Sequence, residues 1–509
     1  MPLSKIYSAE LEGVTARLIE VETDINIGLS SFTIVGLADK AVSEAKERVS
    51  SALKNCGIKP PTRENRKITV NLAPADIKKN GSQYDVAIAL GYLIASEQIK
   101  KFNSNKKIFV GELALDGSIR PIPGVLNICD MARKIGFDCV FIPHKNSKEA
   151  SIIEGIKIIP VAHLREVIAY LEERITIPEL ERESFILPPQ NFSIDISEIK
   201  GQELAKRALS ISAAGSHNLF MSGPPGAGKT MLAQALLSIL PPITQKEALE
   251  TSQIWSAAGM LIDQPYVSSR PFRSPHHTAS IISIIGGGQN PKPGEISLAH
   301  RGVLFLDEVP EFHRDVLESL RQPLESGKVI ISRAKNTLEF PARFMLLLAS
   351  NPCPCGYYQD EDKECKCSFS EIQRYQKKLS GPLLDRIDIH IWVNRIKSED
   401  LRKERNENES KQIRQKIQSA RALQEERFKK FNLPIFSNSE LSSKQIEDII
   451  KISPKAKKIA DTMLDKAHLS ARGYFKIIKI AQTIADMDES ETIEENHLSE
   501  AFSYRSRIS

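Results

Sequence analysis

A phosphate-binding motif occupies residues 223–230, whose sequence GPPGAGKT fits the pattern G-x-x-x-x-G-K-[ST]. An apolar run at residues 218–222 precedes it, and a helical pattern begins at Lys229. Glycines let backbone N–H groups turn inward around phosphate oxygens, and a helix start adds partial positive charge. We expect Lys229 to reach the β- and γ-phosphates of ATP and Thr230 to ligate Mg²⁺. The predicted ATP-binding residues are Gly223, Pro224, Pro225, Gly226, Ala227, Gly228, Lys229 and Thr230.

A second motif, GVLFLDE at residues 302–308, complements the first. Its four apolar residues predict a buried parallel strand that places two carboxylates at its C-terminal end, where open α/β sheets bind ligands. We expect Asp307 to hold Mg²⁺ and Glu308 to polarise the attacking water. The alternative interpretation is that the two acids merely end the strand and have no role in catalysis. The phosphate motif upstream favours ATP hydrolysis.

Three further polar residues could take part in hydrolysis. Asn351 follows the apolar run at residues 344–349, as a residue that orients the water would. Arg386 lies in the segment LLDRID, and Arg472 in the segment LSAR of the later helical region. An arginine supplied by a neighbouring subunit stabilises the charge that develops on the γ-phosphate. Single arginines are usually surface ions, so position alone leaves both interpretations open.

Four of the seven cysteines crowd into one short segment, which indicates metal binding rather than a disulfide framework. The cysteines form two close pairs, Cys353 with Cys355 and Cys365 with Cys367. Four thiolates suit tetrahedral Zn²⁺, and we predict a structural zinc site. The spacing departs from the commoner C-x-x-C arrangement, so free or redox-active thiols remain the alternative. Elsewhere in the chain, His276 and His277 are adjacent to each other, and we expect them to orient a loop rather than bind metal.

The chain divides into three predicted domains of mixed α/β class. Residues 1–175 alternate short β-rich runs with helical stretches, and residues 176–192 carry three prolines in a predicted linker. Residues 193–395 open with helix, strand, glycine-rich turn and helix, which predicts a P-loop core with a parallel sheet. Residues 396–509 have helical apolar spacing among many charges, which predicts a helical domain with a solvated face.

The bulk composition is that of a soluble globular protein, with 41% hydrophobic and 26% charged residues among 509. A formal net charge of +5 permits a nucleic-acid partner without indicating one. The start of the sequence has no apolar core of signal-peptide length, and no apolar run reaches about 18 residues. We therefore expect a cytoplasmic protein with no membrane partner.

Several long strings make the sequence similar to the ComM/YifB group of magnesium-chelatase-like AAA+ ATPases over essentially its whole length. They are NLAPAD at residues 71–76, RPFRSPHHT at 270–278, NPCPCG at 351–356, SGPLLDRID at 380–388 and SARGY at 470–474. The resemblance implies a homo-hexameric ring that translocates on single-stranded or branched DNA and drives branch migration during transformation, with recombination proteins as further partners. It also implies that Arg386 is the finger acting on the next subunit, that Arg472 is a second sensor, and that the helical domain is a lid.

The N-terminal domain resembles the Lon-protease fold through GELALDG at residues 111–117 and PIPG at 121–124. Proteolysis of that type needs a serine nucleophile activated by a lysine. Alignment on this family places Gln83 at the serine position and Leu126 at the lysine position, with Ser82 one residue away from the former. We therefore expect a structural or DNA-contacting domain that lacks the dyad.

Two insertions in the core are candidate DNA contacts by resemblance to helicases of the wider clade. Residues 328–333 and 338–343 predict a hairpin, and we expect Arg333 and Lys335 near its tip to contact phosphates. An exposed hairpin with ordinary charges is the alternative. The second insertion, residues 281–294, carries three glycines and Lys292 and is expected to form a mobile pore loop.

These inferences give a DNA-stimulated ATPase motor as the main hypothesis. A chelatase-type remodeller of a protein partner predicts turnover that is indifferent to DNA and to Lys335→Ala. A Lon-like protease would require peptide cleavage that is abolished at Ser82. A nucleotide-gated scaffold would require that Glu308→Gln change only assembly.

Overall fold

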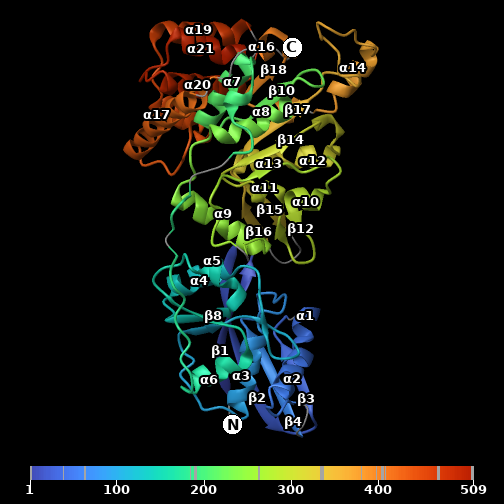
Figure 1. Cartoon of the computed structure of the whole chain (residues 1–509), viewed down its shortest axis with the longest axis vertical. Helices are drawn as coiled ribbons and strands as arrows, with labels where there is room; N and C mark the ends of the chain where they lie inside the picture. Colours follow the sequence, from blue (N-terminus) through green and yellow to red (C-terminus); the bar gives the residue numbers. More distant parts are fainter. Residues whose placement is uncertain are drawn as a thin grey trace.

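The computed structural model divides into an N-terminal domain, a central core and a C-terminal lid, arranged along an elongated molecule (Figure 1). The two chain ends lie at opposite ends of its long axis. The structure describes residues 3–37, 39–61, 65–183, 185–188, 192–261, 264–332, 337–379, 381–396, 398–402, 406, 408–466 and 470–505. Among these residues, no helix combines the length and apolar character needed to cross a bilayer.

The N-terminal domain is built on a seven-stranded mixed sheet with the strand order β3-β4-β2-β1-β5-β8-β9. The strands are β1 (Ser4–Glu12), β2 (Thr15–Ile27), β3 (Ser31–Val35), β4 (Arg66–Ala73), β5 (Lys107–Phe109), β8 (Cys139–Pro143) and β9 (Lys157–Val161). Strands β1 and β2 form a long antiparallel hairpin, and from Ile19 to Ile25 every second residue of β2 is buried, as a half-buried strand requires. A short hairpin, β6 (Glu112–Leu113) and β7 (Ile119–Arg120), lies apart from this sheet.

Helices of this domain pack on the sheet through apolar faces. The helices are α1 (Lys40–Ser43), α2 (Ala45–Asn55), α3 (Asp85–Ala95), α4 (Val125–Ile135), α5 (Ser147–Ala150) and α6 (Leu164–Leu171). Helix α3 is buried over nearly its whole length and contacts both β1 and β2. The described residues between α6 and residue 192 contain neither helix nor strand, and they lead the chain to the core.

The core contains a five-stranded parallel sheet with the strand order β11-β14-β17-β10-β18. Its strands are β10 (Leu219–Ser222), β11 (Phe272–Arg273), β14 (Val303–Leu306), β17 (Met345–Ser350) and β18 (Ile389–Trp392). The three central strands are almost wholly buried, as expected for a parallel sheet covered on both faces. Their register aligns their C-terminal ends, so residues that follow them meet at one edge.

The helices of the core connect these strands and attach the N-terminal domain. They are α7 (Glu203–Gly215), α8 (Lys229–Ala235), α9 (Gln245–Ala258), α10 (Ile281–Ile285), α11 (Glu295–Leu298), α12 (Arg314–Ser319), α13 (Arg321–Ser326), α14 (Phe369–Gln376) and α15 (Gly381–Leu384). Helix α9 packs on α4 of the N-terminal domain (Figure 1). Asn127 Nδ2 donates to the carbonyl of Gln253, and Gln253 Nε2 donates to Asp130, each at 3.1 Å.

Two antiparallel hairpins of the core face the N-terminal domain (Figure 1). One pairs β12 (Gly286–Gly287) with β13 (Lys292–Pro293), and the other pairs β15 (Lys328–Ser332) with β16 (Thr337–Pro341). Arg333 and Lys335, the predicted phosphate contacts, lie outside the described residues.

The lid is helical and shares its apolar interior with the core. Its helices are α16 (Ser398–Leu401), α17 (Glu409–Lys430), α18 (Ser443–Ile449), α19 (Pro454–Lys466), α20 (Ala471–Met487) and α21 (Glu495–Ser503). Helix α20 packs on both α7 and α17, and Ile477 and Ile480 join one cluster with Met221 of β10. The parallel sheet and the overall α/β class agree with the prediction from sequence.

Candidate active site

The phosphate motif forms a loop between β10 and α8. Gly226 and Gly228 have positive φ angles of 78° and 86°, a region that glycine enters without strain. Gly223 is required for a different reason, because a Cβ there would stand 2.2 Å from the carbonyl oxygen of Val393. These three positions fix the turn that delivers Lys229 and Thr230 to the first turn of α8.

The Lys229 side chain is buried and folds back over its own loop. Its Nζ donates to the carbonyls of Gly223 at 2.7 Å and Pro224 at 3.0 Å, and to Asn351 Oδ1 at 3.1 Å. Burial lowers the pKa of Lys229 to about 8, against the attraction of the nearby Asp307 and Glu308 carboxylates. An anionic phosphate would favour the charged amine in the same place.

The two predicted Mg²⁺ ligands lie next to each other. Thr230 Oγ1 donates to Asp307 Oδ2 at 2.6 Å, and Asp307 Oδ1 accepts from the backbone N–H of Glu308 at 2.9 Å. A hydroxyl and a carboxylate are the hard oxygen donors that Mg²⁺ prefers. The donor set therefore fits the ion expected from sequence.

Glu308 occupies a strained backbone position two residues after the end of β14. Its φ and ψ angles of 50° and 45° lie in the left-handed region, which costs a residue with a side chain about 1–3 kcal/mol. The carboxylate is exposed, unlike the strand before it. Asn351 follows β17 in the same way, and its hydrogen bond to Lys229 brings it to the same edge of the sheet. A potential base, an amide and the metal ligands thus meet beside the phosphate loop.

The two predicted arginines lie at a separate place. Arg386 Nη2 donates to Glu325 Oε1 at 2.6 Å, and Arg472 Nη2 donates to the same oxygen. Arg386 follows α15, Arg472 stands in the first turn of α20, and Glu325 belongs to α13. In the described part of the chain, neither arginine contacts the phosphate loop. Glu325 was not predicted, because nothing in its local sequence marks it and only the fold brings both arginines to it.

A basic cavity of about 740 Å³ surrounds this arginine pair. Acidic side chains on its wall are Glu247, Glu325, Asp388 and Glu440. Basic side chains on its wall are Arg270, Arg301, Arg343, Arg386, Arg421, Arg472, Lys476 and Lys479. The excess of positive charge makes the cavity attractive to an anion.

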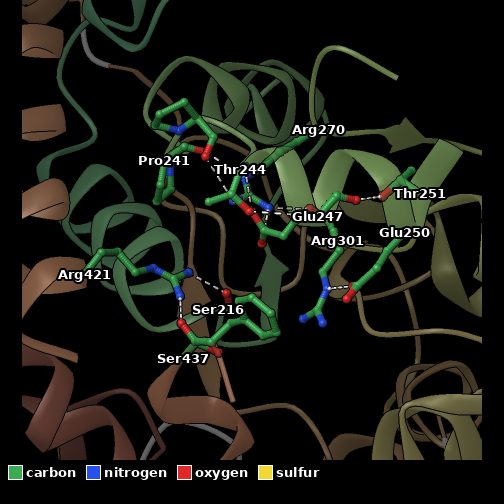
Figure 2. A network of polar contacts seen from close by, with 12 residues as sticks. Ser216, Pro241, Thr244, Glu247, Glu250, Thr251, Arg270, Arg301, Arg421 and Ser437 are labelled. Atoms are coloured by element: carbon green, nitrogen blue, oxygen red, sulfur yellow. Dashed lines mark hydrogen bonds and ion pairs between the residues drawn. The ribbon is translucent and has the colours of Figure 1, made fainter. Parts of the chain in front are cut away.

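Figure 2 shows the polar network on one side of this cavity. Arg270 holds both oxygens of Glu247 at 3.2 and 3.0 Å, and Arg301 Nε donates to Glu250 at 3.0 Å. Burial opposes ionisation of Glu250, but hydrogen bonds from His300 and Arg301 prevail and lower its pKa to about 2. Arg270 belongs to the RPFRSPHHT string, to which the sequence assigned no chemistry. Its contacts are those of a structural anchor.

Arg421 extends this network from helix α17 (Figure 2). Burial, reinforced by repulsion from Arg270, lowers the pKa of Arg421 to about 9. Its guanidinium donates to the Phe436 carbonyl at 2.8 Å and to the Ala213 carbonyl at 2.9 Å. The lid is thereby tied to helix α7 of the core through neutral acceptors.

The four cysteines of the predicted zinc site come together. Their sulfur atoms all lie within 4.8 Å of one another. The closest described pairs are Cys353 with Cys355 at 3.4 Å and Cys355 with Cys365 at 3.6 Å. The backbone N–H of Cys355 points to Cys367 Sγ at 3.4 Å, a contact of the kind that supports thiolate ligands. Four converging sulfurs form a donor set that suits a tetrahedral soft-metal site.

The two histidines contact their own loop. His276 Nδ1 lies 2.8 Å from Thr278 Oγ1, and the rings of His276 and His277 lie 4.1 Å apart. In the described residues, the four cysteines form the one group of three or more potential ligands close enough to share an ion.

The region of the predicted protease-like site holds no serine–lysine pair among the described contacts. Ser82 Oγ donates to Glu112, and the buried Lys79 donates to the carbonyl of Pro74. Leu126 is buried in the apolar interior. A cavity of about 590 Å³ lies here between the domains, and Lys292 of the β12–β13 hairpin lines it.

Comparisons with known proteins cover the whole chain. The family model described as magnesium chelatase, subunit ChlI, matches residues 195–401. Models of subunit ChlI of Mg-chelatase and of the ChlI C-terminal region match residues 21–146 and 407–505.

Two individual relatives are similar over nearly their full length, and a third over a part. Competence protein ComM of Haemophilus influenzae is 42% identical across 100% of this chain and 98% of its own length. YifB of Escherichia coli is 40% identical across 99% and 97%. A Lon protease of Rhizobium meliloti is 28% identical across 38% of this chain and 25% of the protease. The chain therefore belongs to the ComM/YifB family of magnesium-chelatase-like AAA+ ATPases.

Proposed function

We propose that the chain is the subunit of a homo-hexameric, DNA-stimulated motor that drives branch migration during natural transformation. The observation that carries the proposal is the division of the hydrolytic residues between two places in the subunit. Lys229, Thr230 and Asp307 meet at the phosphate loop, whereas Arg386 and Arg472 meet at Glu325. A site divided in this way is completed when one subunit presents its arginines to the nucleotide of the next.

The roles of the individual residues follow from this arrangement. ATP would lie on the phosphate loop, and Mg²⁺ between Thr230 and Asp307 would neutralise phosphate charge. Glu308 would accept a proton from the attacking water, which Asn351 would help to orient. Arg386 and Arg472 of the neighbouring subunit would stabilise the charge that develops on the γ-phosphate.

The proposed DNA contacts lie on the two hairpins of the core. Lys292 is exposed on β13 and projects from the core on the side of the N-terminal domain. Arg333 and Lys335 lie in the sequence between β15 and β16, outside the described residues. Contacts of such residues with phosphates would bind DNA without a preference for its base sequence. The name of the Haemophilus relative, a competence protein, supports a role in handling incoming DNA. Recombination proteins would be further partners, and the activity would be cytoplasmic.

We further propose that the four cysteines hold a structural Zn²⁺ ion. Cys353 is buried and the other three are half-buried, so the site is closed on the protein side. Three or four protein thiolates with no general acid nearby are typical of structural rather than catalytic zinc.

ATP turnover measured with no DNA, with single-stranded DNA and with branched DNA tests the motor. DNA should raise the turnover of the full chain, and Lys335→Ala should lower that stimulation while basal turnover stays the same. Lys328→Ala is the matched control, because Lys328 lies at the base of the same hairpin and pairs with Glu339 at 2.6 Å. Turnover that ignores both DNA forms would overturn the proposal. A branch-migration assay then separates a motor from a DNA-triggered switch.

One observation favours a second candidate, an ATPase that remodels a protein partner. The cavity between the hairpins and the N-terminal domain has Glu10, Glu12, Asp76 and Glu112 on its wall, with Lys78 and Lys292. Such a lining repels a phosphate backbone and accepts a peptide more readily. Turnover that rises with a protein substrate and not with DNA would favour this candidate.

A further inference from the structure

The cysteine loop lies directly against the phosphate loop. Gly356 stands between the first cysteine pair and the rest of the loop, with a positive φ of 83°. A Cβ at this position would come within 2.6 Å of both Cγ and Cδ of Pro225, the third residue of the phosphate motif. It would also stand 3.8 Å from Cγ of Asn351. One face of the cysteine loop therefore forms part of the wall of the nucleotide site.

The same loop begins at the residue that contacts Lys229. Only Pro352 separates Asn351 from the buried Cys353. Gln376 of α14 donates to the Pro352 carbonyl at 3.1 Å, which fixes the start of the loop from the other side. The orientation of the Asn351 amide is thus set by a backbone held between β17 and the sulfur cluster.

Beyond Gly356, a charged side chain attaches the loop to the core. Arg395, which follows β18, lies 3.2 Å from the buried Asp360 carboxylate, and its guanidinium lies over the Tyr357 ring at 5.4 Å. The loop has no strand and few apolar residues of its own. A structural metal supplies the stability that such a short segment cannot obtain from burial.

We propose that zinc bound by Cys353, Cys355, Cys365 and Cys367 braces the nucleotide site through Gly356, so that metal occupancy sets ATP affinity and turnover. With the metal bound, the loop presses on Pro225 and holds Asn351 toward Lys229. Without it, the loop opens, and the site loses both contacts. This inference rests on the proposed ATPase function of the site.

The first test compares metal content with nucleotide affinity in the full chain. Cys365→Ser removes one of the four ligands. Cys365 belongs to the second cysteine pair, which follows Gly356 in the sequence. Zinc measured by mass spectrometry should be stoichiometric in the natural chain and lost in the variant. The dissociation constant for a fluorescent ATP analogue should rise about tenfold, the equivalent of one lost hydrogen bond to a charged group. Cys56→Ser, in the N-terminal domain, is the control and should change neither quantity.

A second variant tests the brace with the metal in place. Gly356→Ala keeps all four cysteines and places a methyl group against Pro225. Gly136→Ala is its matched control, because Gly136 has the same φ of 83° and no described atom within 4 Å of the added carbon. Zinc content should stay stoichiometric in both variants, and nucleotide affinity should fall only in Gly356→Ala.

The outcomes separate this inference from the function on which it rests. A natural chain that binds no nucleotide, with or without zinc, contradicts the ATPase itself. A chain that hydrolyses ATP equally well with and without zinc, or equal affinities in Gly356→Ala and Gly136→Ala, overturns the brace alone. If Cys365→Ser fails to fold, the comparison of Gly356→Ala with Gly136→Ala still tests whether the cysteine loop affects nucleotide affinity.

Discussion

The phosphate loop and the arginine pair differ in how their charges are satisfied. Lys229 is buried among neutral carbonyl and amide oxygens, and the loop that holds it is complete within one chain. Arg386 and Arg472 share one half-exposed carboxylate, which leaves a net positive charge beside an open basic cavity. The first region is preformed for a ligand, whereas the second keeps an excess of positive charge that attracts an anion.

Replacement of Arg386 should give the largest effect. Arg386→Ala should lower ATP turnover about 10³-fold, because arginine fingers contribute at least that much to phosphoryl transfer. Nucleotide affinity, measured separately, should stay within a few-fold of the natural chain. Arg314→Ala, at the exposed start of α12, is the control. If Arg386→Ala lowered nucleotide affinity and left turnover unchanged, Arg386 would contribute to nucleotide binding at the phosphate loop and not to hydrolysis.

Loss of the base should have the next largest effect. Glu308→Gln should lower turnover about 10²-fold, as expected when a positioned base is removed, while ATP still binds. Glu311→Gln, three residues further along and also exposed, should be nearly neutral.

Mixing these two variants sharpens the comparison. Arg386→Ala subunits keep Glu308, and Glu308→Gln subunits keep Arg386. In a mixed ring, some junctions contain both natural residues, so the mixture should turn over ATP faster than either variant alone. A mixture no faster than its components would show that the two halves act within one chain.

The pH dependence of nucleotide affinity should be moderate and should come from the preformed half. Burial lowers the pKa of Lys229 to about 8 in the free site, and a bound phosphate raises it. Affinity should therefore be level below pH 8 and fall by up to tenfold per pH unit above it, as the free amine loses its proton. Lys229→Arg should abolish this dependence, since arginine does not titrate there. A level profile up to pH 9.5 in the natural chain would contradict the assignment.

The smallest effect should come from the carboxylate shared by the arginines. Glu325→Gln leaves Arg386 and Arg472 without a charged partner to align them, so turnover should fall a few-fold with an unchanged Michaelis constant. The unfolding free energy should drop by no more than about 1 kcal/mol, because Glu325 is half-exposed. Glu318→Gln, on α12, is a suitable control.

The sequence predicted the preformed half far better than the other. Gly223, Lys229 and Asp307 belong to short motifs whose spacing fixes their geometry within a strand and a turn. The buried apolar runs before Asp307 and Asn351 also predicted the parallel sheet, which the structure and the family matches confirm. Local chemistry was sufficient because each motif carries its own secondary structure.

Contacts between residues far apart in the chain could not be predicted from the sequence. Glu325 and Arg472 are separated by 147 positions, and no periodicity links them. The first hairpin, β1 and β2, was also missed, although Ile19, Val21 and Ile25 alternate as a half-buried strand requires. The helical stretch of residues 40–55 is divided at Glu44 into α1 and α2, a division that was not predicted from the sequence.

The apolar cluster that joins β10 to α20 has a mechanical consequence. Met221 precedes the phosphate loop by two residues, and Ile477 and Ile480 follow Arg472 on α20 within the same close-packed interior. Such interiors shift as stiff bodies rather than deform gradually. A displacement of β10 by an occupant of the phosphate loop is therefore carried through the subunit to Arg472. The position of Arg472 thus follows the occupancy of the phosphate loop in the same subunit.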